Sequence, residues 1–172
     1  MNKTKWTIIA VIALAIAAAG CWYGWQSGID KNVEEELAAL EKAEADKKQG
    51  SADFIAAKSK ENGVKPLGDG VYYKVLAAGD STQVSPKANQ DIEVTYEMRL
   101  PNGKSVDKRD EPMKMNVGNL IEGVRTALTQ MHAGDEWVIY IPYDKGYGER
   151  GAGSDIPPYS ALEFQVKLCK VL

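Results

Sequence analysis

The feature of this sequence that most constrains its fold is a change in the period of its apolar residues. Residues 91–100 alternate between apolar and polar side chains, as in a strand with one buried face. Residues 121–131 instead carry apolar side chains at helical spacing. These side chains are Ile121, Val124, Leu128 and Met131. A half-buried strand followed by an amphipathic helix predicts a sheet that packs on a helix.

Other segments add strands to this sheet. Residues 71–76, 136–142 and 162–168 are rich in β-branched and aromatic side chains, and a shorter alternation covers residues 113–117. With residues 91–100, this makes about five strands and one helix. Because no strand–helix–strand repeat occurs, the sequence predicts an antiparallel sheet in the α+β class.

The N-terminal residues differ in composition from the rest of the chain. Lys3 and Lys5 precede an uncharged run from Trp6 to Trp25. At about 1.5 Å per residue, this run is long enough to cross a bilayer core of about 30 Å. The basic residues ahead of the run place the N-terminus inside and the remainder outside. We therefore expect residues 1–28 to be an export segment and the domain to face the periplasm or the cell exterior.

Three fates of this segment are compatible with the sequence. The first is an uncleaved signal anchor that attaches the chain to the membrane. The second is a lipoprotein, because Ala18-Ala19-Gly20-Cys21 has the form of a lipobox. The third is cleavage after Ala17-Ala18-Ala19. All three fates export the domain.

Residues 29–63 are expected to form a helical spacer. Residues 30–48 are rich in Ala, Glu and Lys, which are strong helix formers. We expect Gly50-Ser51 to end this helix and a second short helix to follow over residues 52–62. A narrow apolar stripe runs along the first helix at Val33, Leu37 and Leu40. The stripe leaves two interpretations open, a solvated spacer and an arm for weak homodimerisation.

Charge and composition exclude several functions. The net charge of -3 and the pI of about 5.3 argue against nucleic-acid binding, which needs a basic surface. Cys21 and Cys169 lie in different segments and show no disulfide framework or metal-ligand spacing, and Cys169 is expected to be inert. His132 is the single histidine and is expected at the surface near the helix end. We expect no cofactor and no metal.

The segment between the last two strands is unusual in length and composition. Residues 142–158 contain four glycines and three prolines. A loop of this length inside a compact domain is usually either functional or disordered. Its glycines do not lead into a GK[ST] sequence, so a phosphate-binding loop is not expected.

A set of short motifs gives a more specific indication. They are Val94-Thr95-Tyr96, Gly103-Lys104-Ser105-Val106-Asp107, Leu120-Ile121-Glu122-Gly123, Ala127-Leu128 with Met131 and Gly134, Tyr147-Gly148, Ile156-Pro157-Pro158, and Leu162-Glu163-Phe164-Gln165-Val166. In this order and spacing they resemble the FKBP family of peptidyl-prolyl cis-trans isomerases, and the lead-in at residues 54–76 is similar to its exported bacterial members, the Mip and FkpA types. The resemblance implies an FKBP-type domain over residues 64–172, with an antiparallel sheet curved around one short helix.

The resemblance also implies an apolar pocket that holds a prolyl ring between sheet and helix. The residues at the family's catalytic positions are Tyr96, Asp107, Ile121, Tyr147 and Phe164. Those at further substrate-binding positions are Val106, Met113, Leu120, Val124 and Ile156. In the family, the backbone N–H matching Ile121 and the hydroxyl matching Tyr147 bond substrate carbonyls, while the carboxylate matching Asp107 polarises the site. The implied substrates are proline-containing unfolded or exported polypeptides.

Three positions depart from the family pattern. Val106 and Met113 stand where the family usually has Phe, and Val124 stands where Trp is frequent. Each change removes aromatic area, so we predict a wider pocket with weaker isomerase activity and weaker macrolide binding. Two functions therefore stay open: an isomerase that assists folding of exported proteins, and a weakly active or inactive domain that serves as a chaperone or interaction module.

Overall fold

The computed structural model describes residues 26–172, with side chains from residue 33 onward. Of the export segment predicted for residues 1–28, residues 1–25 lie outside the described part of the chain. The chain divides into two compact units between Lys42 and Ala43, and the second unit carries the sheet. Among the described residues, no helix combines the length and the apolar composition needed to cross a membrane.

The first described element is a single long helix, α2 (Gln26–Lys58). The prediction of two helices separated at Gly50-Ser51 was wrong, because the helix continues through both residues. A glycine inside a helix costs only about 1 kcal/mol relative to alanine. Tertiary contacts outweigh this cost, since Ser51 is buried and Ile55, one turn later, belongs to an apolar cluster.

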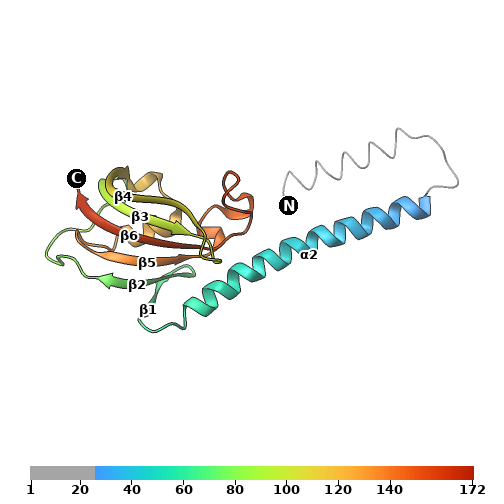
Figure 1. Cartoon of the computed structure of the whole chain (residues 1–172), viewed down its shortest axis with the longest axis horizontal. Coiled ribbons are helices and arrows are strands. Elements are labelled where there is room, and N and C mark those ends of the chain that lie inside the picture. The colour runs from blue at the N-terminus through green and yellow to red at the C-terminus, as the bar shows by residue number, and fades with distance from the viewer. Residues whose placement is uncertain (1–25) are drawn as a thin grey trace. The chain divides into compact units, whose positions relative to one another are not determined.

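Six antiparallel strands form one sheet in the order β1-β2-β5-β6-β3-β4 (Figure 1). They are β1 (Val64–Gly68), β2 (Val71–Ala77), β3 (Asp91–Arg99), β4 (Ser105–Asn116), β5 (Glu136–Ile141) and β6 (Leu162–Val171). The predicted α+β class and the antiparallel pairing are confirmed. The expected count of about five strands is corrected to six.

The two edge strands account for the differences from the prediction. β1 was missed because it is short and contains Pro66, which lacks a backbone N–H and is tolerated in a sheet mainly at an edge. β4 is longer than the expected strand at residues 113–117, and its charged first half hides it from a search for alternating apolar residues. Between the Val94–Met113 and Tyr96–Arg109 pairs, β4 advances four residues while β3 advances two, which forms a bulge.

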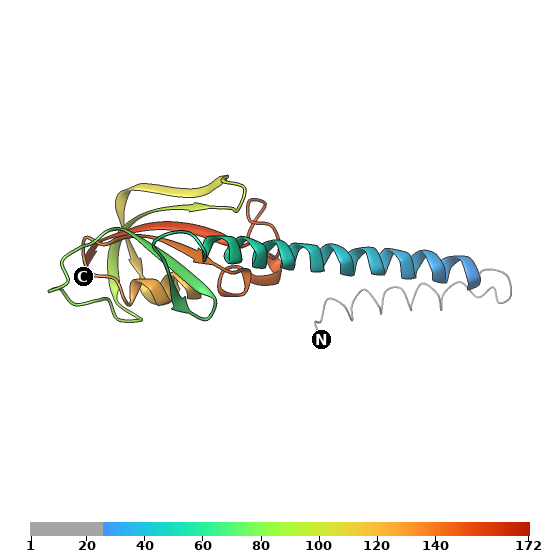
Figure 2. The ribbon, with the colours of Figure 1, turned by 90° about the horizontal axis from the view of Figure 1, so that it is seen from below.

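The short helix α3 (Glu122–Leu128) lies against one face of the sheet, as Figure 2 shows. It follows the 3-10 turn η1 (Val117–Asn119) and buries Gly123, Val124, Ala127 and Leu128. A Cβ added to Gly123 would lie 2.6 Å from Cγ2 of Ile141, so glycine permits the close approach of α3 to β5. The predicted helix is confirmed, although it ends at Leu128, three residues before Met131.

Strand β5 is buried on both faces, and a continuous apolar sequence such as its own is typical of a strand in that position. On one face, Trp137, Ile139 and Ile141 join the main core, which includes the residues of α3. On the other face, Val138 and Tyr140 join a second cluster with Ile55 of α2. The last turns of α2 are therefore packed on the sheet, and the second compact unit accordingly begins at Ala43.

Candidate functional site

The candidate site is built around two stacked aromatic rings on neighbouring strands. Tyr96 of β3 and Phe164 of β6 have ring centroids 5.2 Å apart and planes 18° apart. The Tyr96 hydroxyl donates a hydrogen bond to Asp107 Oδ2 of β4 at 2.6 Å. Alternation along β3 and β6 directs both rings to the face of the sheet that carries α3.

The apolar residues predicted for the pocket gather beside these rings. Val124, Ile156 and Phe164 are buried members of the main core. Val106, Leu120 and Ile121 are half-buried and pack against that core, as does Tyr96. The structure therefore brings together seven of the ten predicted site residues in one apolar cluster, contributed by three strands, α3 with the residues before it, and the long loop.

Ile121 is the residue that caps the N-terminus of α3. Its carbonyl accepts from the Arg125 N–H at 3.0 Å. Its own N–H donates to no acceptor among residues 26–172. A backbone donor beside an apolar surface is available for a ligand carbonyl.

Tyr147 and Asp107 lie at the rim of the cluster. Tyr147 sits between the 3-10 turns η2 (Tyr143–Lys145) and η3 (Gly148–Arg150) and is 36% exposed. Burial raises the pKa of its hydroxyl, and the negative charge of Asp107 raises that pKa further. The pKa of Tyr96 is also raised, to about 12, because of burial and the hydrogen bond to Asp107. Both phenols are therefore neutral hydrogen-bond donors at physiological pH.

The structure differs from the predicted site at two residues. Met113 is 42% exposed and does not belong to the apolar cluster, because it lies just beyond the bulge in β4. Arg109, which sequence reasoning missed, places its guanidinium 3.8 Å from Asp107 Oδ1. No sequence signal identified Arg109, because it stands inside a charged run whose side chains are mostly exposed.

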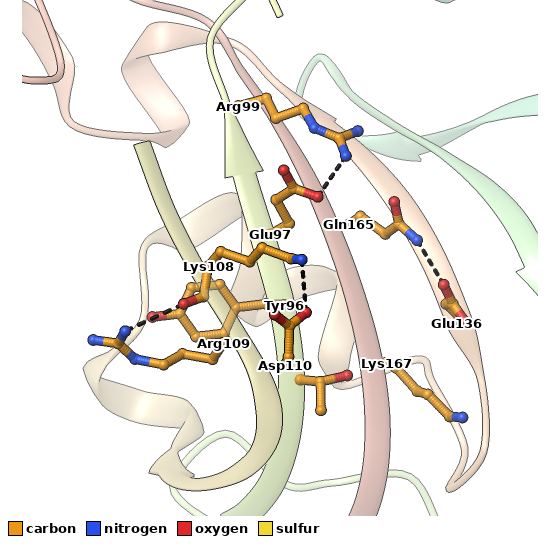
Figure 3. A pocket seen from close by; sticks show the side chains of 10 residues that line it. Tyr96, Glu97, Arg99, Lys108, Arg109, Asp110, Glu136, Gln165 and Lys167 are labelled. Atoms are coloured by element: carbon orange, nitrogen blue, oxygen red, sulfur yellow. Dashed lines mark hydrogen bonds and ion pairs between the residues drawn. The ribbon is translucent and has the colours of Figure 1, made fainter. Parts of the chain in front are cut away.

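A groove of about 360 Å³ on the opposite face of the sheet has a different character. Figure 3 shows the side chains that line it, which are mostly polar and include Tyr96 and Arg109 of the candidate site. Gln165 donates to Glu136 at 2.6 Å, Lys108 pairs with Asp110 at 2.8 Å, and Arg99 pairs with Glu97. Charged side chains, among them Lys108, Asp110 and Glu136, line this groove, so it does not offer an apolar surface for a prolyl ring.

The remaining residues singled out in the sequence lie away from the rings. His132 is in a turn after α3, with Nδ1 3.6 Å from Oδ2 of the buried Asp135. Its side chain is 33% exposed, so the expected surface position is only partly correct. Cys169 is half-buried near the end of β6. Within the described part of the chain, no group of three or more His, Cys, Asp or Glu residues is arranged to hold a metal ion.

Residues 82–169, about half of the chain, match the family described as FKBP-type peptidyl-prolyl cis-trans isomerase. The chain belongs to this family. The matched segment contains the stacked rings of the FKBP domain, Asp107, Ile121, Tyr147 and Ile156. Residues 64–81, which form β1, β2 and the following loop, precede the match.

Relatives with curated names agree with this assignment. The peptidyl-prolyl cis-trans isomerase Mip of Coxiella burnetii is 42% identical over 124 residues, covering 70% of this chain and 53% of that protein. The outer membrane protein MIP of Legionella longbeachae is 34% identical over 133 residues, covering 76% of this chain and 56% of that protein. The chain thus spans about half the length of these relatives.

A solved structure supports the fold of the FKBP domain. The crystal structure of a peptidyl-prolyl cis-trans isomerase from Pseudomonas syringae pv. tomato superposes with a TM-score of 0.70 at 35% identity. The match covers 74% of this chain and 94% of that one.

Proposed function

We propose that this chain accelerates the cis–trans isomerisation of X-Pro peptide bonds in exported polypeptides. The observation that carries the proposal is the stacked pair Tyr96 and Phe164 beside a buried apolar cluster, with Asp107 and Tyr147 at its rim. The family to which the chain belongs is named for this reaction. The names of its relatives favour the isomerase over a domain that serves only as a chaperone.

The proposed mechanism needs no nucleophile. Rotation about an amide costs about 18–20 kcal/mol because the planar form is stabilised by resonance. The planar amide is also the more charge-separated form, so removal of water from it favours the twisted state. An apolar surface that fits the twisted prolyl bond therefore lowers the barrier by binding the transition state more tightly than the ground state.

Named residues supply the polar contacts in this proposal. The Ile121 N–H and the neutral Tyr147 hydroxyl donate to the substrate carbonyls on either side of the prolyl ring. Asp107 holds the Tyr96 hydroxyl, which fixes the ring that stacks on Phe164. Val106, Leu120, Val124 and Ile156 form the apolar wall.

The three departures from the family pattern make this a modest catalyst in our proposal. Val124 is fully buried, so it supports the pocket floor from below and offers a prolyl ring almost no surface of its own, unlike an indole. Met113 is exposed. It contacts the substrate only if the substrate residues next to the prolyl ring lie along the β4 side of the site. We expect weaker isomerase activity and weaker macrolide binding than in relatives with aromatic side chains there.

Isomerisation of a short X-Pro peptide by the full chain tests the proposal. We expect Tyr147→Phe to lower kcat/KM about two- to tenfold, since it removes one neutral hydrogen bond. Asp107→Ala should lower it by at least as much, because it also frees the Tyr96 ring. Both variants should fold, since neither side chain belongs to the buried core.

Asp110→Asn is the matched control. Its carboxylate is on the same strand but is 76% exposed and pairs only with Lys108 among the described residues. Its rate should equal that of the parent chain. A folded parent chain that does not accelerate the exchange would exclude the isomerase and leave the chaperone function.

Membrane attachment, export and self-association complete the proposal. Export rests on Lys3, Lys5 and the apolar run that follows, and homodimerisation rests on the exposed Leu37 and Leu40 of α2. Cell fractionation of the full chain tests export and membrane attachment, and its sedimentation in detergent tests self-association. A protein found only in the cytosol contradicts export and attachment, and a monomer at all concentrations contradicts self-association.

A further inference from the structure

The long loop between β5 and β6 is attached to helix α2 at both of its ends. At the start of the loop, the Tyr143 N–H donates to Ser51 Oγ of α2 at 3.4 Å, and Ser51 is 4% exposed. At its end, the fully buried Ala161 packs in one cluster with Ile55 of α2. All these residues lie in the same compact unit, Ala43–Leu172.

Tyr159 makes the most specific of these attachments. Its ring lies beneath the ammonium of Lys48, with Nζ 4.8 Å from the ring centroid. The Tyr143 ring meets it edge-on, with centroids 5.4 Å apart and an angle of 71°. Its side chain is buried, and burial and the nearby Glu44 carboxylate raise the pKa of its hydroxyl.

The backbone of Tyr159 shows that these contacts hold it in place. Its φ is 62°, a left-handed conformation that glycine adopts readily and that is uncommon for a bulky residue such as tyrosine. Such a conformation persists only where the surrounding structure determines it. Its ring contacts Lys48 and Tyr143, and Glu44 interacts with its hydroxyl, so residues of α2 and of the loop together surround this conformation.

Two paths connect Tyr159 to the candidate site. Its N–H donates to the carbonyl of Gly148 at 3.1 Å, and Gly148 directly follows Tyr147. On the other side, Pro157 and Pro158 join it to Ile156, whose N–H and carbonyl both bond Ala152. The stiffness of two consecutive prolines limits independent movement of Ile156.

We propose that α2 positions the substrate-binding loop, with Lys48 acting as a positioning residue through the ring of Tyr159. The proposal rests on the proposed function, since it assigns a purpose to the loop that carries Tyr147 and Ile156. Lys48 does not touch the substrate. Its contact fixes the conformation of Tyr159, and Tyr159 fixes the backbone next to Tyr147.

Two measurements on the full chain test this proposal. Hydrogen exchange of the peptide covering residues 142–161 reports the loop without reference to activity, and kcat/KM for an X-Pro peptide reports the site. We expect Lys48→Ala to speed exchange in the loop about two- to fivefold and to lower kcat/KM by a similar factor, as expected for loss of one cation–π contact. Lys48→Arg keeps a cation over the ring and should restore both values.

Lys47→Ala is the matched control, because Lys47 is exposed on the same turn of α2. It should leave both measurements unchanged. Unchanged loop exchange in Lys48→Ala would overturn the proposal, and so would faster exchange with unchanged kcat/KM. If the parent chain proves to lack isomerase activity, the proposed function fails, and the exchange measurement alone then decides whether α2 holds the loop.

Discussion

At the scale of single residues, the bond between Tyr96 and Asp107 has the clearest consequence. Burial removes water from the Tyr96 hydroxyl, Asp107 accepts a hydrogen bond from it, and the negative charge of Asp107 opposes ionisation of the phenol. These effects together raise the pKa of Tyr96 to about 12. In the unfolded chain the same hydroxyl titrates near its ordinary value of about 10.

This difference predicts a loss of stability at alkaline pH. A group whose pKa is raised in the fold stabilises it fully below the unfolded pKa, and this contribution is lost as the pH rises through the folded pKa. The free energy of unfolding should therefore fall between pH about 10 and about 12. Urea denaturation at several pH values, monitored by fluorescence, measures this decline.

Tyr96→Phe isolates the contribution of one hydroxyl from those of the other tyrosines. The variant should be less stable at neutral pH by about 1 kcal/mol, because one hydrogen bond is lost. Its stability should also decline less steeply in the alkaline range. An equal decline in both proteins would show that Tyr96 is not the group responsible.

At the scale of elements, two glycines inside helices should respond oppositely to the same substitution. Gly50 lies in α2 with open space around it, so Gly50→Ala should stabilise the fold by about 0.5–1 kcal/mol. Gly123 lies in α3, where an added Cβ meets the fully buried Ile141. Overpacking costs about 1–3 kcal/mol, which exceeds the gain in helix propensity. Gly123→Ala should therefore destabilise the fold by about 1 kcal/mol.

Thermal unfolding of the two variants checks the signs. Each serves as the control for the other, because the chemical change is identical and only the surroundings differ. A Gly123→Ala variant as stable as the parent would show that α3 can shift away from β5. Such a shift should also appear as altered amide resonances at Ile121, the residue that caps α3.

At the scale of the whole molecule, the compact unit that carries the sheet includes the last turns of α2. We expect residues 43–172 to unfold with the same free energy as the full chain, within about 0.5 kcal/mol. A chain that begins at residue 64 uncovers Val138, Tyr140 and Ala161 and loses Ile55 and Phe54. Burial of these two side chains is worth about 3 kcal/mol or more, so the shorter chain should be less stable by that amount.

Denaturation of both truncated chains in urea measures the difference, with Ile55→Ala in the full chain as a less drastic test. That single change should cost about 2 kcal/mol, because Ile55 is 8% exposed in its cluster. Equal stability of the chains that begin at residues 43 and 64 would show that the last turns of α2 do not stabilise the unit that carries the sheet.

The sequence by itself determined the class of the fold and the family. Alternation along residues 91–100 and 162–168 and the helical period of residues 121–131 require one buried face on each element, so they predicted the antiparallel sheet and α3. The motifs that contain Tyr96, Asp107 and Phe164 resembled the FKBP family, and the match over residues 82–169 confirmed it.

Only the tertiary structure decided the conformation and the packing partners of segments whose local sequence pattern is weak or conflicts with packing. Gly50-Ser51 indicated a break, yet contacts between α2 and the sheet keep the helix continuous. The apolar run of β5 does not say what covers its second face, and β1 and β4 lie at edges where burial leaves little periodicity. The contact of Lys48 with Tyr159 joins positions 111 residues apart, and no spacing in a sequence encodes such a pair. Periodicity records how deeply each face of an element is buried, whereas the partner that buries it is set by how the elements pack.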